Sequence, residues 1–150
     1  MEPFVIVARE GAVVTATLNN PDQRNAITTR AQIDEIVDFC AAVAADRTIH
    51  AVVLTGAGPA FCAGGNVKDM LRRESMFEGS PWEIRNSYRE MIQRIPHALW
   101  EREVPVVAAI NGPAVGAGLD LACMADIRIA ADSARFAESF AKLGIVPGDG

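Results

Sequence analysis

Residues 106–118 read VVAAINGPAVGAG: an apolar strand, a break at Asn-Gly-Pro, and small residues that lead into a helix. Residues 52–66, VVLTGAGPAFCAGGN, repeat the same order of strand, loop and helix start. Strands that alternate with helices are typical of an α/β fold. We therefore expect the strands that begin near Val52 and Val106 to lie in one buried sheet system.

The chain before this region predicts a hairpin and a long helix. Residues 4–8 and 12–18 are rich in Val, Thr and Ile on either side of a Glu-Gly pair, which is typical of two strands joined by a tight turn. Thr28 or Thr29 can cap the helix that follows. The apolar positions of this helix keep helical spacing and are Ile33, Ile36, Val37, Cys40 and Val43.

Further elements complete the predicted α/β pattern. The apolar run at 51–54 is typical of a strand buried on both faces, and residues 127–130 predict one more strand. Residues 116–124 predict a short helix. An apolar stripe over 84–99 predicts another helix, which Pro96 should kink or end because proline lacks an N–H and clashes with the preceding turn.

Length, composition and charge limit the class of protein. The chain has 150 residues, of which 50% are hydrophobic and 22% are charged, as expected for one globular domain. Its net charge of −5 gives no electrostatic reason to expect a nucleic acid or an anionic membrane as a partner. Six arginines between residues 72 and 102 are balanced by six glutamates between 74 and 103, which predicts a solvated helical face rather than a basic patch.

Cysteines and hydrophobic runs indicate a protein of a reducing cytoplasm. The three cysteines form no CxxC pair, and with two histidines they make a metal site improbable. The first ten residues carry Glu2 and no basic stretch, so they do not resemble a signal peptide. The longest near-apolar run, residues 104–119, is interrupted by prolines and glycines and is shorter than the ~20 residues of a membrane span.

Several common catalytic motifs are absent from the sequence. The two Gly-Ala-Gly segments have Phe61 and Leu121 where a dinucleotide fingerprint needs its third glycine. No P-loop and no GxSxG nucleophile elbow occurs. Cys62 is expected to be a small buried hydrophobe, because no base is placed beside it.

The two loops that follow the apolar strands are the candidate reaction site. Small residues let a ligand approach the backbone there, and main-chain N–H groups beside a helix start can stabilise an anion that develops on a substrate. Two such loops can supply two donors. The alternative is that these glycines serve only tight turns and close helix packing.

Five blocks in order along the chain resemble the crotonase superfamily, the enoyl-CoA hydratase/isomerase family. Together they run from residue 18 to near the last residue. They are LNNPDQRNA at 18–26, VLTGAG with FCAG at 53–58 and 61–64, AAING at 108–112, ADIRIA at 125–130, and LGIVPG at 143–148.

The resemblance implies a crotonase-like (ClpP/crotonase) α/β fold of repeated ββα units and an acyl-CoA thioester substrate. It implies that the N–H groups of Gly65 and Ala117 form an oxyanion hole for a thioester enolate. No separate cofactor is implied, because coenzyme A is part of the substrate. The substrate-binding positions carried over from the family are Arg24 and Ala26 at the nucleotide end, and Ala63, Asn66, Val67 and Lys68 near the first donor, where the family commonly has aspartate in place of Asn66.

The resemblance also assigns the proton-transfer positions. Hydratases of this family use two glutamates on one water; the first position falls on Asp120 and the second on Phe140, which cannot move a proton. Asp120 should lie about one helical turn after Ala117, and an apolar pocket would raise the pKa of its carboxylate. Glu138 and Asp149 are the acids near the second position. Three readings follow: a hydratase-type enzyme, an isomerase that uses Asp120 alone, or a thioester-binding protein without hydratase activity.

The chain ends inside the last matching motif. Residues 1–150 correspond to an N-terminal crotonase core without the C-terminal helical region that family members have. The resemblance implies a homotrimer or hexamer when that region is present. Acyl length and branching are not readable from the sequence.

Overall fold

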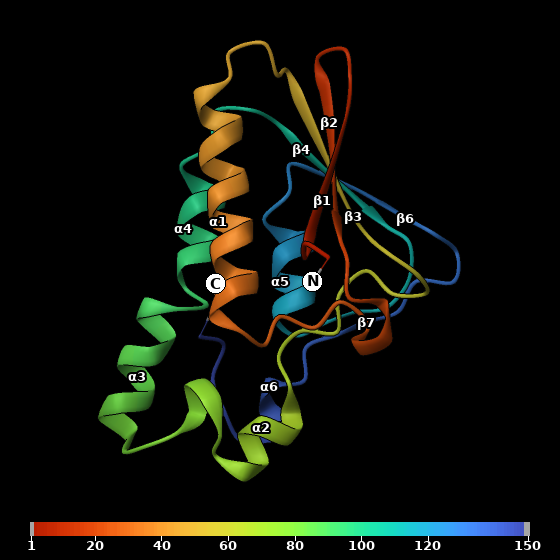
Figure 1. The fold of residues 1–150 in the computed structure, drawn as a ribbon. Coiled ribbons are helices and arrows are strands. Elements are labelled where there is room, and N and C mark those ends of the chain that lie inside the picture. Colours follow the sequence, from red (N-terminus) through yellow and green to blue (C-terminus); the bar gives the residue numbers. More distant parts are fainter. Residues whose placement is uncertain (1, 149–150) are drawn as a thin grey trace.

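The computed structural model describes residues 2–148, which form a sheet with helices packed on one side (Figure 1). Two short 3₁₀ helices span Pro21–Gln23 and Ser75–Phe77. The strands are β1 (Val5–Glu10), β2 (Val13–Leu18), β3 (Ala51–Gly56), β4 (Val106–Ile110), β5 (Ala114–Val115), β6 (Ile127–Ala130) and β7 (Phe136–Ala137). The helices are α1 (Arg30–Ala45), α2 (Val67–Arg72), α3 (Pro81–Glu90), α4 (Arg94–Trp100), α5 (Ala117–Cys123) and α6 (Phe140–Leu143).

The large sheet has the strand order β1-β2-β3-β4-β6. β1 and β2 form the predicted antiparallel hairpin, and the remaining pairs are parallel. β3 and β4 pair directly, with Val52 opposite Val106, so the predicted common sheet is confirmed. Because neighbouring parallel strands end at the same edge, the loops that follow β3 and β4 emerge side by side.

A second, small sheet accounts for the repeated ββα units. β5 pairs in parallel with β7, and Cys62 forms an isolated parallel bridge to Ala114 of β5. Each repeat thus contains a long strand, a short strand or bridge, and a helix: β3 to α2, β4 to α5, and β6 to α6. The small sheet lies at the end of the large one where the loops meet (Figure 1).

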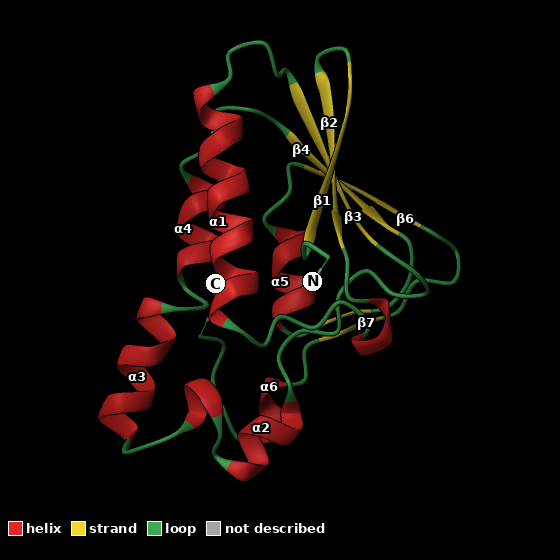
Figure 2. Cartoon of the chain, viewed as in Figure 1, coloured by secondary structure: helices red, strands yellow, loops and turns green. Residues whose placement is uncertain are grey.

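The helices gather on one face of the large sheet, as Figure 2 shows for α1, α4 and α5. Along β3 and β4 every second residue is buried and its neighbours are half-buried. The prediction that β3 is buried on both faces is therefore wrong, because the described helices cover only one face. On the other face Ile127 and Ile129 of β6 are exposed.

α1 forms for the reasons read from the sequence. Thr29, rather than Thr28, is the N-cap and makes a capping box with Gln32. The stripe residues Ile33, Ile36 and Cys40 are buried against the sheet. The predicted helix over 84–99 is instead two helices.

The break between α3 and α4 lies at residues 91–93, before Pro96 and not at it. Met91 leaves helical geometry with φ −119° and ψ −98°. Pro96 sits in the first turn of α4, where the N–H that it lacks would have no intrahelical acceptor. The expectation that Pro96 kinks or ends the helix is therefore wrong, because proline is well tolerated at a helix start.

Candidate active site

The loops after β3 and β4 are joined through their main chains. The N–H groups of Phe61 and Cys62 donate to the Pro113 carbonyl at 3.1 and 3.2 Å. In the other direction, the Val115 N–H donates to the Cys62 carbonyl at 3.0 Å. These contacts come from backbone atoms, so the geometry of the junction does not depend on long side chains.

Two glycines make this junction sterically possible. Gly64 has φ +78°, and a Cβ there would lie 2.5 Å from the Val115 carbonyl oxygen and 3.3 Å from the Ala117 nitrogen. A Cβ at Gly118 would lie 2.1 Å from the Cys62 carbonyl oxygen. Both approaches exclude any side chain. Close packing is thus one role of these glycines, and it also brings the segment around Gly65 next to the start of α5.

Gly65 and Ala117, the two predicted donors, line one pocket. Ala117 is the first residue of α5, so its N–H has no acceptor within the helix. Among the described residues, neither the Gly65 N–H nor the Ala117 N–H donates to a backbone carbonyl. Both residues thus border one cavity, and the main-chain N–H of each is without a backbone acceptor in the described part of the chain.

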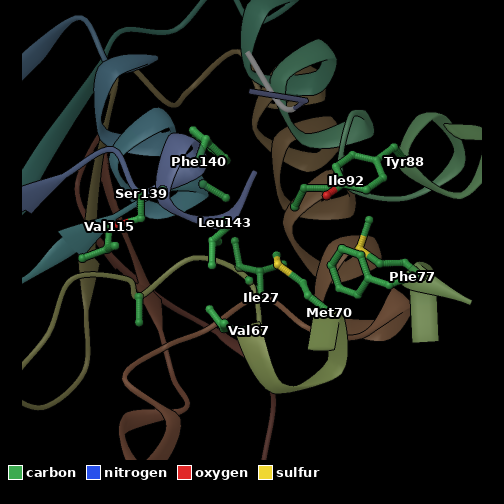
Figure 3. Close-up of a pocket in the computed structure, with 15 residues that line it drawn as sticks. Ile27, Val67, Met70, Phe77, Tyr88, Ile92, Val115, Ser139, Phe140 and Leu143 are labelled. Carbon is green, nitrogen blue, oxygen red and sulfur yellow. The ribbon is translucent and has the colours of Figure 1, made fainter. Parts of the chain in front are cut away.

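The rest of this pocket is almost entirely apolar (Figure 3). Of the predicted substrate-binding residues, Ala63, Val67 and Phe140 line it. Val115 and Gly116, in the loop that the sequence selected, line it too. Sequence reasoning missed the rest of the wall, because apolar residues of separate segments carry no local signal that they meet at one cavity. The missed lining residues are Ile27, Met70, Met76, Phe77, Tyr88, Ile92, Ser139 and Leu143.

Asp120 lies one helical turn after Ala117, as predicted. It is half-buried and lines a smaller neighbouring cavity together with Ala117, Ile27 and Ile92, which also border the main pocket. The structure thus places Asp120 beside the donor pocket rather than in its wall. Glu138 is exposed after β7 and lines neither cavity, and Asp149 lies outside the described residues.

Two asparagines hold the loop that leads to Gly65. Asn25 is fully buried, and its amide nitrogen donates to the carbonyls of Ala57, Ala60 and Phe61 at 2.9 to 3.2 Å. Asn111 donates to the Ala60 carbonyl from the other side at 3.2 Å. Asn25 stood in the sequence only as part of a matching block. A small amide within a loop motif gives no signal that it will be buried.

The predicted coenzyme A positions are distributed around the first donor loop. The carbonyl of Arg24 accepts a hydrogen bond from the Ala63 N–H at 2.9 Å, so its loop adjoins the Ala63–Gly64 segment, while the Arg24 side chain is exposed. Ala26 is buried. Asn66 is the N-cap of α2 and accepts from the Lys68 N–H at 3.0 Å. Arg24, Ala26, Asn66 and Lys68 do not line the main pocket.

Titratable groups with shifted pKa values lie outside this pocket. Burial raises the pKa of the Cys40 thiol to about 11, as expected for a cysteine of the core. Asp126 directly precedes β6, and a hydrogen bond from the N–H of Val106, the first residue of β4, lowers its pKa. Among residues 2–148, no group of three or more His, Cys, Asp or Glu side chains could hold a metal ion. No helix of that part is long and apolar enough to cross a bilayer.

Known proteins are similar to this chain in both sequence and fold. Residues 8–150 match the family model of the enoyl-CoA hydratase/isomerase family. The chain is 39% identical to a probable enoyl-CoA hydratase of Mycobacterium tuberculosis, covering 97% of this chain and 54% of that protein. It is 35% identical to the 1,2-epoxyphenylacetyl-CoA isomerase of Escherichia coli, covering 98% and 55%.

A solved structure extends the likeness to three dimensions. The crystal structure of an enoyl-CoA hydratase/carnithine racemase from Magnetospirillum magneticum superimposes with a TM-score of 0.85 at 33% identity, over 97% of this chain and 53% of that one. The chain therefore spans about half the length of the relatives it matches. The matched region contains the ββα repeats and both donor loops. On this sequence and fold, the chain belongs to the enoyl-CoA hydratase/isomerase family and has the crotonase fold.

Proposed function

We propose that this chain binds an acyl-CoA thioester and stabilises its enolate with the N–H groups of Gly65 and Ala117. The observation that carries the proposal is that both residues line one apolar pocket. Negative charge on the thioester oxygen grows as the enolate forms. Two fixed donors in a weakly polar cavity stabilise that charge more than they stabilise the neutral thioester, which lowers the barrier.

Asp120 is the proposed proton-transfer residue. It lies one turn after the second proposed donor on α5 and lines a small cavity that shares Ala117, Ile27 and Ile92 with the main pocket. Phe140, which the sequence resemblance aligns with the second glutamate of the family's hydratases, lines the pocket. With one carboxylate, removing a proton from one carbon and returning it to another is chemically simpler than adding water. Isomerisation of an enoyl-CoA is therefore the second candidate beside hydration.

The proposal is tested by replacing Ala117 with proline in the protein as the cell produces it. Proline removes the N–H yet suits the first position of a helix, and the preceding Gly116, at φ 51° and ψ −127°, tolerates a following proline. Loss of one oxyanion donor typically lowers turnover ~100-fold to ~1,000-fold. Turnover is measured by the absorbance of enoyl-CoA substrates, with cis and trans double bonds tested separately.

Arg30→Pro is the matched control, because it places proline at the first position of α1, away from the pocket. It should leave turnover nearly unchanged. Normal turnover in Ala117→Pro would show that the oxyanion hole is elsewhere. Tight binding of acyl-CoA by the unaltered protein, with no reaction of any enoyl-CoA, would instead favour a thioester-binding protein. In such a protein Phe140, in place of the second glutamate, would account for the lack of hydratase activity.

The remaining features are proposed on the family relationship. They are an acyl-CoA partner without a separate cofactor, a homotrimer or hexamer, and a cytoplasmic location.

A further inference from the structure

An open groove adjoins the donor pocket on the side of α2 and α3. It is bordered by these two helices and by the segment after α6, and its volume is about 1190 Å³. Val67, Met70, Phe77, Tyr88 and Leu143 line both the pocket and the groove. The two cavities are therefore continuous. A chain that starts at the donors can extend past these side chains into the groove.

The groove carries positive charge that the sequence does not reveal. Of the six arginines between residues 72 and 102, three have carboxylate partners: Arg72 lies 3.9 Å from Glu74, Arg94 pairs with Asp34, and Arg102 lies 2.7 Å from Asp126. The other three, Arg73, Arg85 and Arg89, all line the groove.

Within residues 2–148, no carboxylate is found beside these three arginines in the lining of the groove. None of them forms an ion pair with a residue of the described chain, and none of the groove's described lining residues is acidic. The predicted solvated face is present, because Arg85 and Arg89 of α3 are exposed. The equal numbers of arginines and glutamates in the sequence do not extend to the described groove lining, which contains three arginines and no acidic residue, in a protein whose net charge is −5.

The arrangement has a physical cost unless an anion is present. Arg85 and Arg89 are four residues apart on α3, where like charges repel each other across one helical turn. Ile84 and Tyr88 supply apolar surface between and beside them. The groove thus combines an apolar wall with guanidinium groups, which bind carboxylates through paired hydrogen bonds.

We propose that this groove binds an acyl chain that ends in a carboxylate, so that the substrate is an enoyl-CoA of a dicarboxylic acid. This inference rests on the proposed function. The thioester oxygen is at Gly65 and Ala117, the apolar middle of the chain passes Met70 and Tyr88, and the terminal carboxylate meets Arg85 and Arg89. The phosphates of coenzyme A are the other source of anions. They are assigned to the side of Arg24 and Lys68, which line neither cavity.

The test compares two enoyl-CoA substrates of equal chain length, one with a terminal carboxylate and one with a terminal methyl group. In the protein without substitutions, as the cell produces it, kcat/KM should be higher for the carboxylated substrate than for the methyl-terminated one. Arg85→Gln combined with Arg89→Gln should lower kcat/KM for that substrate about tenfold, as expected for charge-assisted hydrogen bonds at a partly exposed site. The rate with the methyl-terminated substrate should change less than about twofold.

Arg72→Gln is the control, because it makes the same arginine-to-glutamine change on α2, at a residue that does not line the groove. It should affect both substrates equally and slightly. An equal loss for both substrates in the double variant would assign the arginines to the phosphates of coenzyme A, and no loss for either would mean that they bind no anion. Both outcomes would overturn the inference.

Turnover of the methyl-terminated substrate reports on the proposed function, whereas the ratio between the two substrates reports on this inference. If neither substrate reacts, the same ratio is measured as binding affinity with the saturated acyl-CoA pair, by calorimetry. A preference for the carboxylated acyl-CoA that the double variant abolishes would support the groove even in a protein without turnover. Equal affinities would contradict it.

Discussion

The donor loops and the α2–α3 segment border the same pocket, but they are held in different ways. The two loops are joined by main-chain hydrogen bonds and by the Asn111 amide, and the loop after β3 is also held by the buried amide of Asn25. The α2–α3 segment presents large side chains to solvent: Leu71 is 85% exposed and Trp82 is 69% exposed. The geometry around the proposed thioester site therefore depends on backbone packing. The surface proposed for the acyl chain depends on side chains that can change without disturbing the fold.

The largest effect is expected from Gly118→Ala in the rigid junction. The added methyl group would meet the Cys62 carbonyl oxygen at 2.1 Å, and neither backbone segment can move freely. We expect the free energy of unfolding to fall by about 3 kcal/mol or more. Denaturant unfolding measures the loss.

Gly65→Ala is the matched control in the same site. The nearest atom to its new Cβ is the flexible end of Met70, at 3.2 Å, and the main-chain N–H is kept. Its stability should change by less than about 1 kcal/mol. Equal losses in the two variants would mean that the junction is no more rigid than its surroundings.

A second large effect is expected for Asp120→Asn, which keeps the side-chain shape and removes the base. Turnover should fall ~100-fold or more with little change in thioester affinity, as for a general base. Steady-state kinetics and acyl-CoA binding are measured on one preparation. Unchanged turnover would leave Asp120 as an acid in the first turn of α5, where the helix dipole favours it, and would move the search to Glu138 and Asp149.

A smaller and more selective effect is expected for Met70→Ala in the α2–α3 segment. Met70 is half-buried and lines both cavities, so its loss removes apolar contact with the acyl chain. We expect kcat/KM to fall about fivefold for long acyl chains, the equivalent of roughly one buried methylene group, and to stay constant for short ones. Trp82→Ala, exposed on α3 and outside both cavities, should change neither. A uniform loss at every chain length would contradict the assignment of this segment to the acyl chain.

The smallest expected effect is on the pH dependence of stability, when Asp126 beside β4 is replaced by asparagine. The hydrogen bond from the Val106 N–H, together with Arg102, holds the pKa of Asp126 below its ordinary value. A lowered folded-state pKa stabilises the fold above the unfolded-state pKa, and this stabilisation is lost as pH falls through the folded-state pKa. The difference in unfolding free energy between the protein and Asp126→Asn should therefore be constant near neutrality and shrink below about pH 4. A difference that grows on acidification would reverse the sign.

Local patterns were sufficient for most elements of the fold and failed where the environment of an element mattered. The cap at Thr29 and the stripe of α1 depend on neighbours a few residues away, so the helix could be read from its own sequence. The break at residues 91–93 could not, because the stripe continues through it from α3 into α4. Burial of β3 was overestimated because an apolar run in the sequence does not show whether one or both faces of the strand are covered.

For the site, the sequence and the structure answered different questions. The order of strand, small-residue loop and helix was enough to select the donor loops, because a glycine where backbones nearly touch and a free N–H at a helix start are properties of a few consecutive residues. The packing of distant segments placed Met70, Phe77 and Tyr88 around the pocket, buried Asn25, and separated Arg73, Arg85 and Arg89 from the glutamates beside them in the chain. These features depend on distances between segments, and such distances exist only once the chain has folded.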